Sequence, residues 1–319
     1  MLGFFDNSYV LVTGGAGFIG SHIVDRLMEL GAKVKVLDDL SSGSLENLSR
    51  WRNNPNFELI NGDIRNPEIV KEAVRGISVV FHQAAKVSVP FSIENPTLVA
   101  DVNGMGTVIL LDECRKADME KVVVASSSSV YGETSTLPKI ESMITEPISP
   151  YGVSKLTAER MAIAFAKTYN LNTTTLRYFN IFGPRQRGGS YAGVISIFIN
   201  NGFTNQPFPI FGDGTQTRDF TFVRDVVDCN IRAAMSEKTN GEVYNVAGGQ
   251  QITINRLGEI IKSLTGSTSE FQYLPKREGD IEHSLADISK AQRDFGYEPT
   301  VDIESGLKKT IEWMTETRE

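Results

Sequence analysis

Two side chains near the middle of the chain have the types and spacing of a proton-accepting pair. Tyr151 and Lys155 lie four residues apart, so a helix would place them on one face. A lysine ammonium beside a phenol favours the phenolate and lowers the tyrosine pKa from about 10, so Tyr151 could act as a base near neutral pH. An ordinary exposed helical pair has the same spacing, so this pair alone does not establish a catalytic site.

A run of four serines, residues 126–129, could supply a hydroxyl next to this base. The run follows an apolar segment, residues 121–125, that is expected to form a strand. At the carboxyl end of a parallel strand, a serine hydroxyl can donate a hydrogen bond to one substrate oxygen. A polar turn after a strand would also explain the serines, so a second signal at the same sheet edge is needed.

Three glycines near the N-terminus, Gly14, Gly17 and Gly20, supply that second signal. Residues 9–13 suit a buried strand, and apolar residues then recur at helical spacing from Ile19 onward. Gly14 would permit the turn, Gly17 would let the backbone approach a pyrophosphate, and Gly20 would let helix and sheet pack closely. The free N–H groups at the helix start would hold the anion. Any tight strand-to-helix turn can carry such glycines, so the following strand decides the interpretation.

The next predicted strand, residues 33–37, ends in two acids, Asp38 and Asp39. Asp38 follows Gly20 by 18 residues, close to the roughly 20 expected of an acid that binds a ribose hydroxyl. The 2′-phosphate of NADP would face both carboxylates, and no nearby basic residue would relieve that repulsion. The acids therefore predict NAD, with Asp38 on the ribose; Asp39 could also be an ordinary loop acid or cap.

Composition bounds the class of protein. The net charge of −7 and the lack of a dense basic patch argue against nucleic acid as a partner. The start of the chain does not have the pattern of a signal peptide and no apolar run is long enough for a membrane span, so we expect a cytoplasmic protein. Cys114 and Cys229 are expected to be buried and inert. His22, His82 and His283 show no ligand spacing, so no metal is predicted.

Alternating strands and helices must position these groups. Predicted strands cover residues 9–13, 33–37, 57–60, 78–82, 121–125 and 173–177, and the longest predicted helices cover 96–117 and 151–169. This alternation predicts an α/β fold with a doubly wound parallel sheet of the Rossmann type. After residue 180 the rhythm changes, with glycine, proline and arginine in residues 182–189 and 211–219. We expect a dinucleotide domain at 1–180 and a smaller α/β substrate domain mainly at 181–319, with some later segments returning to the first.

A series of motifs occurs in order along nearly the whole chain: residues 13–20 (TGGAGFIG), 62–65 (GDIR), 82–85 (HQAA), Asn103, Ser127 with Tyr151 and Lys155, 177–180 (RYFN), 218–220 (RDF) and 277–280 (REGD). With this series the chain resembles the extended short-chain dehydrogenase/reductase family, and within it the nucleotide-sugar 4-epimerases. The resemblance implies a tightly bound NAD that is regenerated in each cycle. Beside the glycines and acids, the residues implied to contact NAD are Phe18, Ile19, Asp63, Ile64, Gln83, Ala84, Ala85, Lys86, Asn103, Tyr151, Lys155 and Phe179.

The resemblance also implies the catalytic and substrate residues. Ser127, Tyr151 and Lys155 would be catalytic, with Lys155 also on the nicotinamide ribose. The implied contacts to a UDP-sugar are Ser88, Ser127, Ser128, Ser129, Asn180, Arg218, Arg277, Asp280 and Ser284. Arginine forks suit a diphosphate, and an acidic protein needs such local cations to hold one.

The implied reaction is inversion at C4 of the sugar through a 4-keto intermediate. Relatives that dehydrate or decarboxylate sugars carry acids in the serine run, and residues 126–129 contain none. Ser284 stands where epimerases restricted to plain sugars carry a tyrosine, so UDP-GlcNAc and UDP-GalNAc should fit, with UDP-glucose and UDP-galactose also possible; it could equally be a small loop residue. A dehydratase or decarboxylase of the same family, or a non-catalytic NAD-sensing protein, is the alternative. A homodimer joined through the two long helices is also implied.

Overall fold

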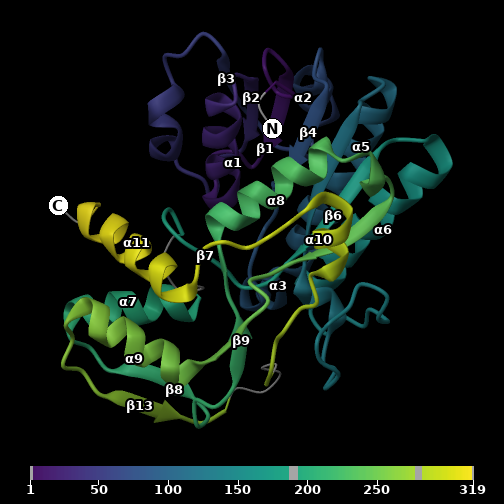
Figure 1. Ribbon diagram of the computed structural model, residues 1–319. Helices are drawn as coiled ribbons and strands as arrows, with labels where there is room; N and C mark the ends of the chain where they lie inside the picture. Colours follow the sequence, from purple (N-terminus) through teal and green to yellow (C-terminus); the bar gives the residue numbers. More distant parts are fainter. Residues whose placement is uncertain (1–2, 187–192, 277–281, 318–319) are drawn as a thin grey trace.

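A parallel sheet of seven strands, in the order β11-β6-β5-β4-β1-β2-β3, forms the centre of the computed structural model, which describes residues 3–186, 193–276 and 282–317 (Figure 1). The sheet confirms the predicted doubly wound α/β fold. The strands are β1 (Tyr9–Thr13), β2 (Lys33–Asp38), β3 (Phe57–Asn61), β4 (Val79–His82), β5 (Lys121–Ser127), β6 (Thr173–Tyr178) and β11 (Glu242–Val246).

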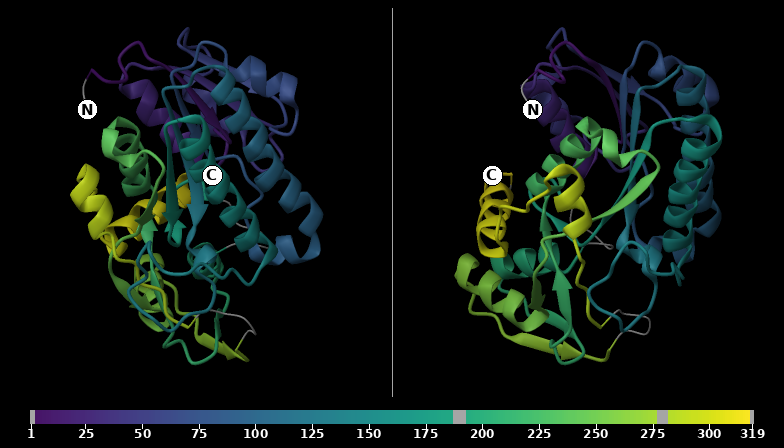
Figure 2. Two further views of the ribbon diagram at one scale, coloured as in Figure 1. Left: turned by 90° about the vertical axis from the view of Figure 1, so that its right-hand side faces the viewer. Right: turned by 45° about the vertical axis from the view of Figure 1, so that its right-hand side comes forward.

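Helices cover both faces of this sheet, as the two further views show (Figure 2). One face packs against α1 (Phe18–Glu29) and α8 (Val223–Met235). The other packs against α2 (Pro67–Val74), α5 (Gly106–Lys116) and α6 (Pro150–Tyr169). Because both faces are covered, the central strands bury nearly every side chain, which explains their continuous apolar runs.

The six predicted strands agree with the structure to within two residues at each end. The seventh strand, β11, was not predicted. It pairs with β6 from Glu242 beside Thr174 to Val246 beside Tyr178, although 63 residues separate the end of β6 from its start. With α8, it brings part of the later chain back to the large sheet. Sequence periodicity does not reveal such a long-range pairing, because the partner strand is chosen by packing.

The helix expected at 96–117 is interrupted by a wider turn. The structure has α4 (Pro96–Val99), a π-helical segment η2 (Ala100–Met105) and then α5. Asn103 lies in the widened segment, where its amide donates to the Lys86 carbonyl over 3.0 Å and accepts from the Lys86 N–H over 2.8 Å. Such bulges are frequent at functional sites. The helix thus fixes the backbone of the segment after β4.

The remaining helices and strands pack mainly around a second core below the sheet in Figure 1. This part has three short two-stranded pairings, β8 with β13, β9 with β12 and β7 with β10. The elements not yet placed are η1 (Leu45–Trp51), α3 (Val89–Glu94), η3 (Ser128–Tyr131), β7 (Ile181–Phe182), α7 (Val194–Thr204), β8 (Phe208–Phe211), β9 (Thr217–Asp219), β10 (Thr221–Phe222), η4 (Glu237–Thr239), β12 (Gln251–Thr253), α9 (Ile254–Thr265), β13 (Phe271–Leu274), α10 (Ser289–Phe295) and α11 (Ile303–Glu316). Within the described residues, no helix is both long and apolar enough to cross a membrane.

Candidate active site

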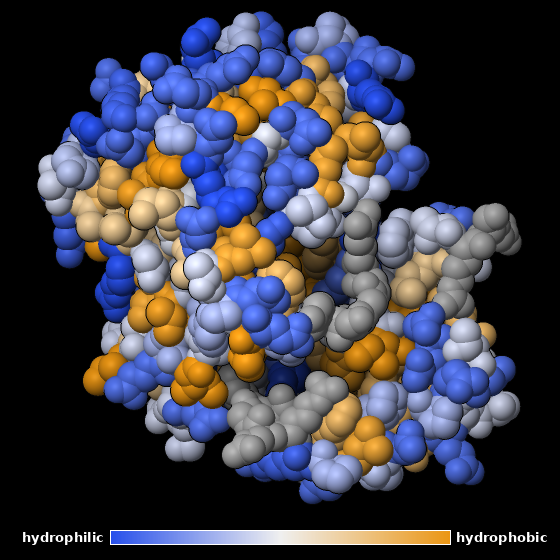
Figure 3. Space-filling model, turned by 180° about the vertical axis from the view of Figure 1, so that it is seen from behind, coloured by the Kyte–Doolittle hydropathy of each residue, from blue (hydrophilic) through white to orange (hydrophobic). Residues whose placement is uncertain are grey.

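A cavity of about 590 Å³ lies at the carboxyl edge of the large sheet. Its lining includes Gly14 after β1, Asp38 and Asp39 at the end of β2, residues 62–64 after β3, 83–87 after β4, 125–127 at the end of β5, and Tyr178, Asn180 and Ile181 around the end of β6. Seen from behind, the molecular surface is hollowed between its upper and lower parts (Figure 3). The cavity lies where a doubly wound sheet binds ligands.

The glycine turn forms one wall of the cavity with little space for any other residue. Gly14 has a φ of 68°, and a Cβ there would approach the Ala84 nitrogen to 2.6 Å. A Cβ on Gly20 would come within 2.1 Å of the Gly14 carbonyl, so Gly20 permits the close helix contact. Gly17 precedes α1 and lines the cavity, and no side chain among the described residues caps the helix there. The N–H groups of the first turn therefore fit the diphosphate of a dinucleotide.

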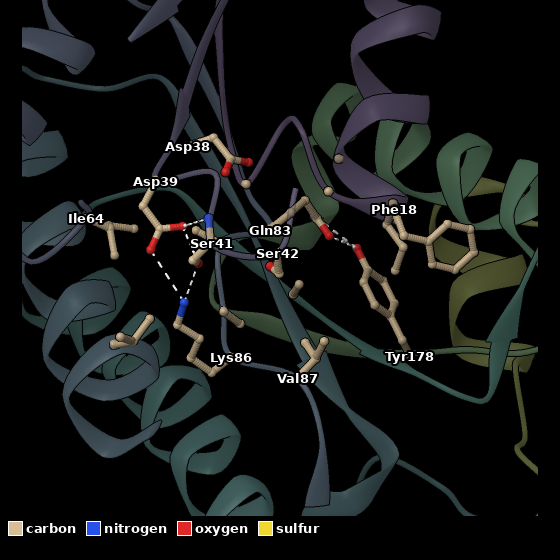
Figure 4. Close-up of a pocket in the computed structure, with 18 of the residues that line it drawn as sticks. Phe18, Asp38, Asp39, Ser41, Ser42, Ile64, Gln83, Lys86, Val87 and Tyr178 are labelled. Carbon is tan, nitrogen blue, oxygen red and sulfur yellow. Dashed lines mark hydrogen bonds and ion pairs between the residues drawn. The ribbon is translucent and has the colours of Figure 1, made fainter. Parts of the chain in front are cut away.

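Asp38 and Asp39 lie together at the end of β2 but have different partners (Figure 4). The Asp38 carboxylate accepts hydrogen bonds from the Ala16 N–H at 2.9 Å and the Leu40 N–H at 2.8 Å. Burial raises the pKa of Asp38 against these bonds. Asp39 accepts from Ser41, and its pKa is lowered because hydrogen bonds and a lysine outweigh burial.

That lysine corrects the sequence analysis. Lys86 Nζ lies 3.4 Å from Asp39 Oδ2 and also contacts the Ser41 hydroxyl (Figure 4). The expectation that no basic residue lies near the acids is therefore wrong. Lys86 follows β4, which is two strands away from β2 in the sheet, so the fold brings together residues that are 47 positions apart. The charge of Asp39 is therefore neutralised by Lys86, whereas the Asp38 carboxylate accepts hydrogen bonds from backbone N–H groups.

The other predicted cofactor residues divide into those that line the cavity and those that lie behind it. Phe18, Ile19, Asp63, Ile64 and residues 83–86 line it, and Asp63 also pairs with Arg65 at 2.6 Å. Asn103 is outside the lining described here but holds the Lys86 backbone.

Phe179 differs from the expectation that it lines the nicotinamide end. It packs in a separate core cluster, 6.1 Å from the Tyr131 ring between centroids, whereas its neighbour Tyr178 lines the cavity. Successive residues at a strand end point to opposite sides, so one of the two must face away. The Gln83 amide donates to the Tyr178 hydroxyl at 3.1 Å, and that hydroxyl can donate to Asn230 at 3.0 Å. Tyr178 is thus a lining residue that the sequence analysis missed.

Tyr151, Lys155 and Ser127 meet in the cavity wall. Pro150 begins α6, and the Ser149 hydroxyl caps it by accepting from the Gly152 N–H at 3.1 Å, so both reactive side chains lie in the first two turns. Lys155 Nζ donates to the Ala125 carbonyl at 2.9 Å, which ties α6 to the end of β5. Ser127 faces the Tyr151 phenol closely enough to lower the pKa of that group.

The pKa of Tyr151 differs in direction from the expectation. Burial raises it, and the hydrogen bond with Ser127 opposes the rise; Lys155 is not what lowers it. Burial also lowers the pKa of Lys155 to about 8, so its charge is easily lost at this position. In this structure Ser127 is the group that favours the tyrosinate.

Ser129 orients the Ser127 hydroxyl. The backbone N–H and the hydroxyl of Ser129 both donate to Ser127 Oγ, at 3.2 and 3.0 Å. The Ser127 proton thereby stays available for Tyr151 or a substrate oxygen. Ser128 and Ser129 lie outside the cavity lining as described, in the turn η3. Ser88 caps α3 by accepting from the Phe91 N–H at 3.2 Å.

The predicted sugar-diphosphate residues are less completely assembled. Asn180 lines the cavity and donates to the Asp219 carbonyl at 2.9 Å. Arg218 donates to the Thr217 and Glu282 carbonyls at 2.9 and 3.2 Å. Ser284 is buried and pairs through its N–H with the Thr217 carbonyl at 3.1 Å, outside the described lining. Arg277 and Asp280 lie outside the described residues.

The histidines have structural partners. Both His82 nitrogens contact threonine hydroxyls, Thr13 at 2.7 Å and Thr107 at 2.9 Å, while His22 contacts the Pro184 carbonyl at 3.0 Å.

Some residues line the cavity that the sequence did not indicate: Ser41, Ser42, Asn47, Arg185 and Gln186. The cluster of residues 182–189 was the only sequence signal for the last two. A tyrosine and a serine hydroxyl beside a dinucleotide cradle can move a proton while a hydride is transferred.

Comparison with known proteins defines the family. Residues 11–310 match the family model described as GDP-mannose 4,6 dehydratase. The chain is 40% identical to the Thermotoga maritima UDP-glucose 4-epimerase solved with UDP-glucose, covering 98% of this chain and 100% of that one, with a TM-score of 0.92. It is also 40% identical to the Methanobrevibacter ruminantium UDP-N-acetylglucosamine 4-epimerase solved with UDP-N-acetylmuramic acid, covering 98% and 99% with a TM-score of 0.94.

A third structure is similar in sequence and carries a cofactor. The Thermus thermophilus UDP-glucose 4-epimerase, solved with NAD, is 34% identical over 96% of this chain and 99% of that one, with a TM-score of 0.88. Each of these three similarities covers at least 96% of this chain. The chain therefore belongs to the GDP-mannose 4,6-dehydratase family of extended short-chain dehydrogenases/reductases, among its nucleotide-sugar 4-epimerases.

Proposed function

We propose that this protein interconverts UDP-sugars that differ in configuration at C4, with NAD as a resident cofactor. UDP-GlcNAc and UDP-GalNAc are the proposed main pair, and UDP-glucose and UDP-galactose a second pair. The observation that carries the proposal is the meeting of Ser127, Tyr151 and Lys155 in the wall of a cavity that also contains the glycine turn. The reaction has no net redox change, so one NAD can serve every cycle.

The cavity wall supports NAD as the cofactor. The first turn of α1 would hold its diphosphate, Asp38 its ribose, and Asp63 with Ile64 its adenine. A Cβ on Gly17 would meet only the Gly14 oxygen, at 3.1 Å, and would otherwise extend from the cavity wall into this space. When bound, NAD supplies a hydride acceptor for C4 of the sugar and returns the hydride to the other face of that carbon.

Tyr151 would accept the proton of the sugar 4-hydroxyl. Ser127, whose oxygen already accepts from Ser129, would donate its own proton to the same sugar oxygen or to Tyr151. This bond favours the tyrosinate, because it lowers the pKa that burial raises. Lys155, fixed on the Ala125 carbonyl, would hold the ribose next to the tyrosine and place a positive charge there when protonated.

The serine run favours epimerisation over dehydration. Elimination of water or carbon dioxide needs an acid or base beyond the pair that serves C4, and residues 126–129 supply hydroxyls only. The nearest carboxylate from α6, Glu159, is buried on Arg177 at 2.6 Å and is not free to act on the sugar. Since the family model is described as a dehydratase, mass spectrometry is the direct test: epimerisation conserves the mass of the sugar, and dehydration lowers it.

Ser284 is the proposed determinant of the 2-acetamido group. It is a small buried residue next to the strand that carries Arg218. In Ser284→Tyr the larger ring should exclude the N-acetylated pair and preserve turnover of UDP-galactose. Equal loss of both activities would reject the role in size selection. Ser284→Ala is the matched control, since it keeps the space open, and both pairs should still be turned over.

We further propose that residues 1–180 bind NAD together with α8 and β11, which return to the large sheet, while the later loops bind the sugar nucleotide.

A homodimer through the helices of residues 96–117 and α6 is also proposed. It is supported by apolar side chains there that are half exposed: Met105 at 54% and Val153 at 51%. Met105→Glu with Val153→Glu should convert a dimer to a monomer in sedimentation velocity, whereas an unchanged mass would reject this interface.

The central experiment uses the purified protein without added NAD. It is incubated separately with UDP-GlcNAc and with UDP-glucose, and proton NMR reads the configuration at C4. The proposed function predicts a mixture of both C4 epimers from UDP-GlcNAc. A changed sugar mass would indicate a dehydratase or decarboxylase, and retained configuration with NAD bound would indicate a non-catalytic protein.

A further inference from the structure

Arg185 lines the cavity but has no role in the function proposed above. It follows β7 in the segment that connects the large sheet to the second core. Its backbone has a φ of 68°, in the left-handed region that a residue with a Cβ seldom adopts. Surrounding contacts must therefore fix the residue in this conformation.

Two contacts attach this segment to α1. Arg185 Nη2 lies 2.7 Å from Asp25 Oδ2, and the Trp51 indole N–H donates to the other Asp25 oxygen at 2.7 Å. One turn closer to the helix start, His22 contacts the Pro184 carbonyl at 3.0 Å. The segment thus lies along the helix whose first turn, at Phe18 and Ile19, lines the cavity.

The other end of the guanidinium is buried without a partner. Among the residues that the structure describes, Arg185 Nη1 is closed to solvent and has no hydrogen-bond acceptor. A buried donor on a charged group is especially unfavourable when its hydrogen bond is not made. Because the arginine lines the cavity, the missing acceptor is expected from a ligand rather than from the protein.

We infer that Arg185 binds a phosphate oxygen of a diphosphate held beside the first turn of α1. The inference rests on the proposed function, because both NAD and a UDP-sugar carry such a group. The chemistry fits: a guanidinium matches phosphate oxygens, and Asp25 fixes its orientation while Nη1 stays directed away from the ion pair. The positive end of the α1 dipole adds to the attraction. In a chain with a net charge of −7, this local cation would offset the repulsion of a dianionic diphosphate group.

The test measures ligand retention separately for the two diphosphates. Arg185→Met and Arg185→Lys are compared with wild type for NAD content after gel filtration, the rate of NAD loss on dilution, and UDP affinity by calorimetry. Arg50→Met is the matched control, because Arg50 also pairs with a carboxylate of α1, Glu29 at 2.8 Å, but lies outside the described lining. Epimerase activity of the wild type is measured alongside.

In Arg185→Met we expect one diphosphate ligand to bind roughly ten- to a hundredfold more weakly, as for a lost hydrogen bond between charged groups. Faster NAD loss identifies the dinucleotide as the source, and weaker UDP binding identifies the sugar nucleotide. The Lys variant should be intermediate, since it keeps the charge but not the fork, and it decides the question if the Met variant does not fold. Retention of both ligands within twofold in a folded variant would overturn the inference. An inactive wild type with this binding loss would reject the proposed function but not the role of Arg185.

Discussion

Two buried carboxylates, Glu159 in the large α/β part and Asp219 at the end of β9, each join several segments, but their partners differ. Glu159 on α6 pairs with Arg177 of β6 at 2.6 Å and accepts from the Ser126 hydroxyl of β5 at 3.1 Å. Asp219 ends β9, and within the described residues its carboxylate accepts hydrogen bonds from backbone N–H groups, those of Gly248, Gly249 and Ala286 at 2.9 to 3.2 Å. One carboxylate is balanced by a cation, and the other by dipoles.

The two regions are therefore stabilised in different ways. Tyr151, Lys155 and Glu159 are spaced by four residues along one face of α6, so the helix that carries the base also fixes the ends of β5 and β6. The region around Asp219 consists of short strands and loops, and burial raises the pKa of Asp219 to about 6. Removing a charged partner should therefore destabilise the region around Glu159. In the region around Asp219, stability should instead depend on pH.

The largest expected effect is on the chemistry at the sheet edge. Tyr151→Phe removes the proposed base and should lower kcat by about 10²- to 10⁴-fold. NAD content, read from the absorbance of the denatured supernatant, should stay the same because the cradle is intact. Turnover close to that of wild type would show that the sheet edge does not supply the base.

Glu159→Gln should test the charge-balanced side. The variant leaves the Arg177 guanidinium, only 2% exposed, without its counter-ion, so we expect the free energy of unfolding to fall by about 3–5 kcal/mol. Guanidinium denaturation measures the change. The control is Glu29→Gln, which breaks an exposed pair with Arg50 and should cost at most about 1 kcal/mol. If both variants lowered the free energy of unfolding equally, the buried Glu159–Arg177 pair would stabilise the fold no more than an exposed ion pair does.

Asp219→Asn should test the dipole-balanced side through pH. The pKa of Asp219 is about 6 in the folded chain and 3.8 in the reference state, so between these values the folded state binds more protons. This contribution to stability is fully present below pH 3.8 and is lost as pH rises through 6, by about 3 kcal/mol. Urea unfolding of wild type minus variant should show that fall from pH 4 to pH 7. If the difference in unfolding free energy did not change with pH, the backbone N–H groups would stabilise the ionised Asp219 enough to offset its burial.

The smallest effect should come from Ser127→Ala. Ser127 lowers the pKa of Tyr151, so its loss should raise that pKa. The increase of kcat/KM with pH, which follows ionisation of the tyrosine, should then occur at higher pH. Turnover near pH 7 should fall by roughly 10- to 100-fold, within the range of one positioned hydrogen bond. Ser129→Ala, which removes only a donor to Ser127, should shift the profile less. If neither variant shifted the pH profile of kcat/KM, Ser127 would not influence the ionisation of Tyr151.

Local patterns were enough for much of the fold. The six predicted strands and the start of α6 follow from apolar runs and from Ser149 and Pro150, which act within a few residues. The glycine turn followed for the same reason, because the φ of Gly14 and the contact of Gly20 are set by the turn itself. The wider turn at Ala100–Met105 carried no such local signal.

The candidate site shows the same division. The sequence brought Tyr151 and Lys155 together, because helical spacing alone places them on one face. It did not indicate that burial would raise the Tyr151 pKa, that Tyr178 rather than Phe179 would line the cavity, or that Lys86 would reach Asp39. Each of these depends on which distant segments pack together.

The parallel α/β fold, the glycine turn and the spacing of the proposed catalytic residues could all be predicted from the sequence, since they depend on local periodicity and turn geometry. Three features could be seen only in the folded chain: β11 completes the sheet, Lys86 neutralises Asp39, and Arg185 lines the cavity with one buried nitrogen that has no partner among the described residues. These features join residues far apart in the chain, and the burial and charge that give them their effect exist only after packing.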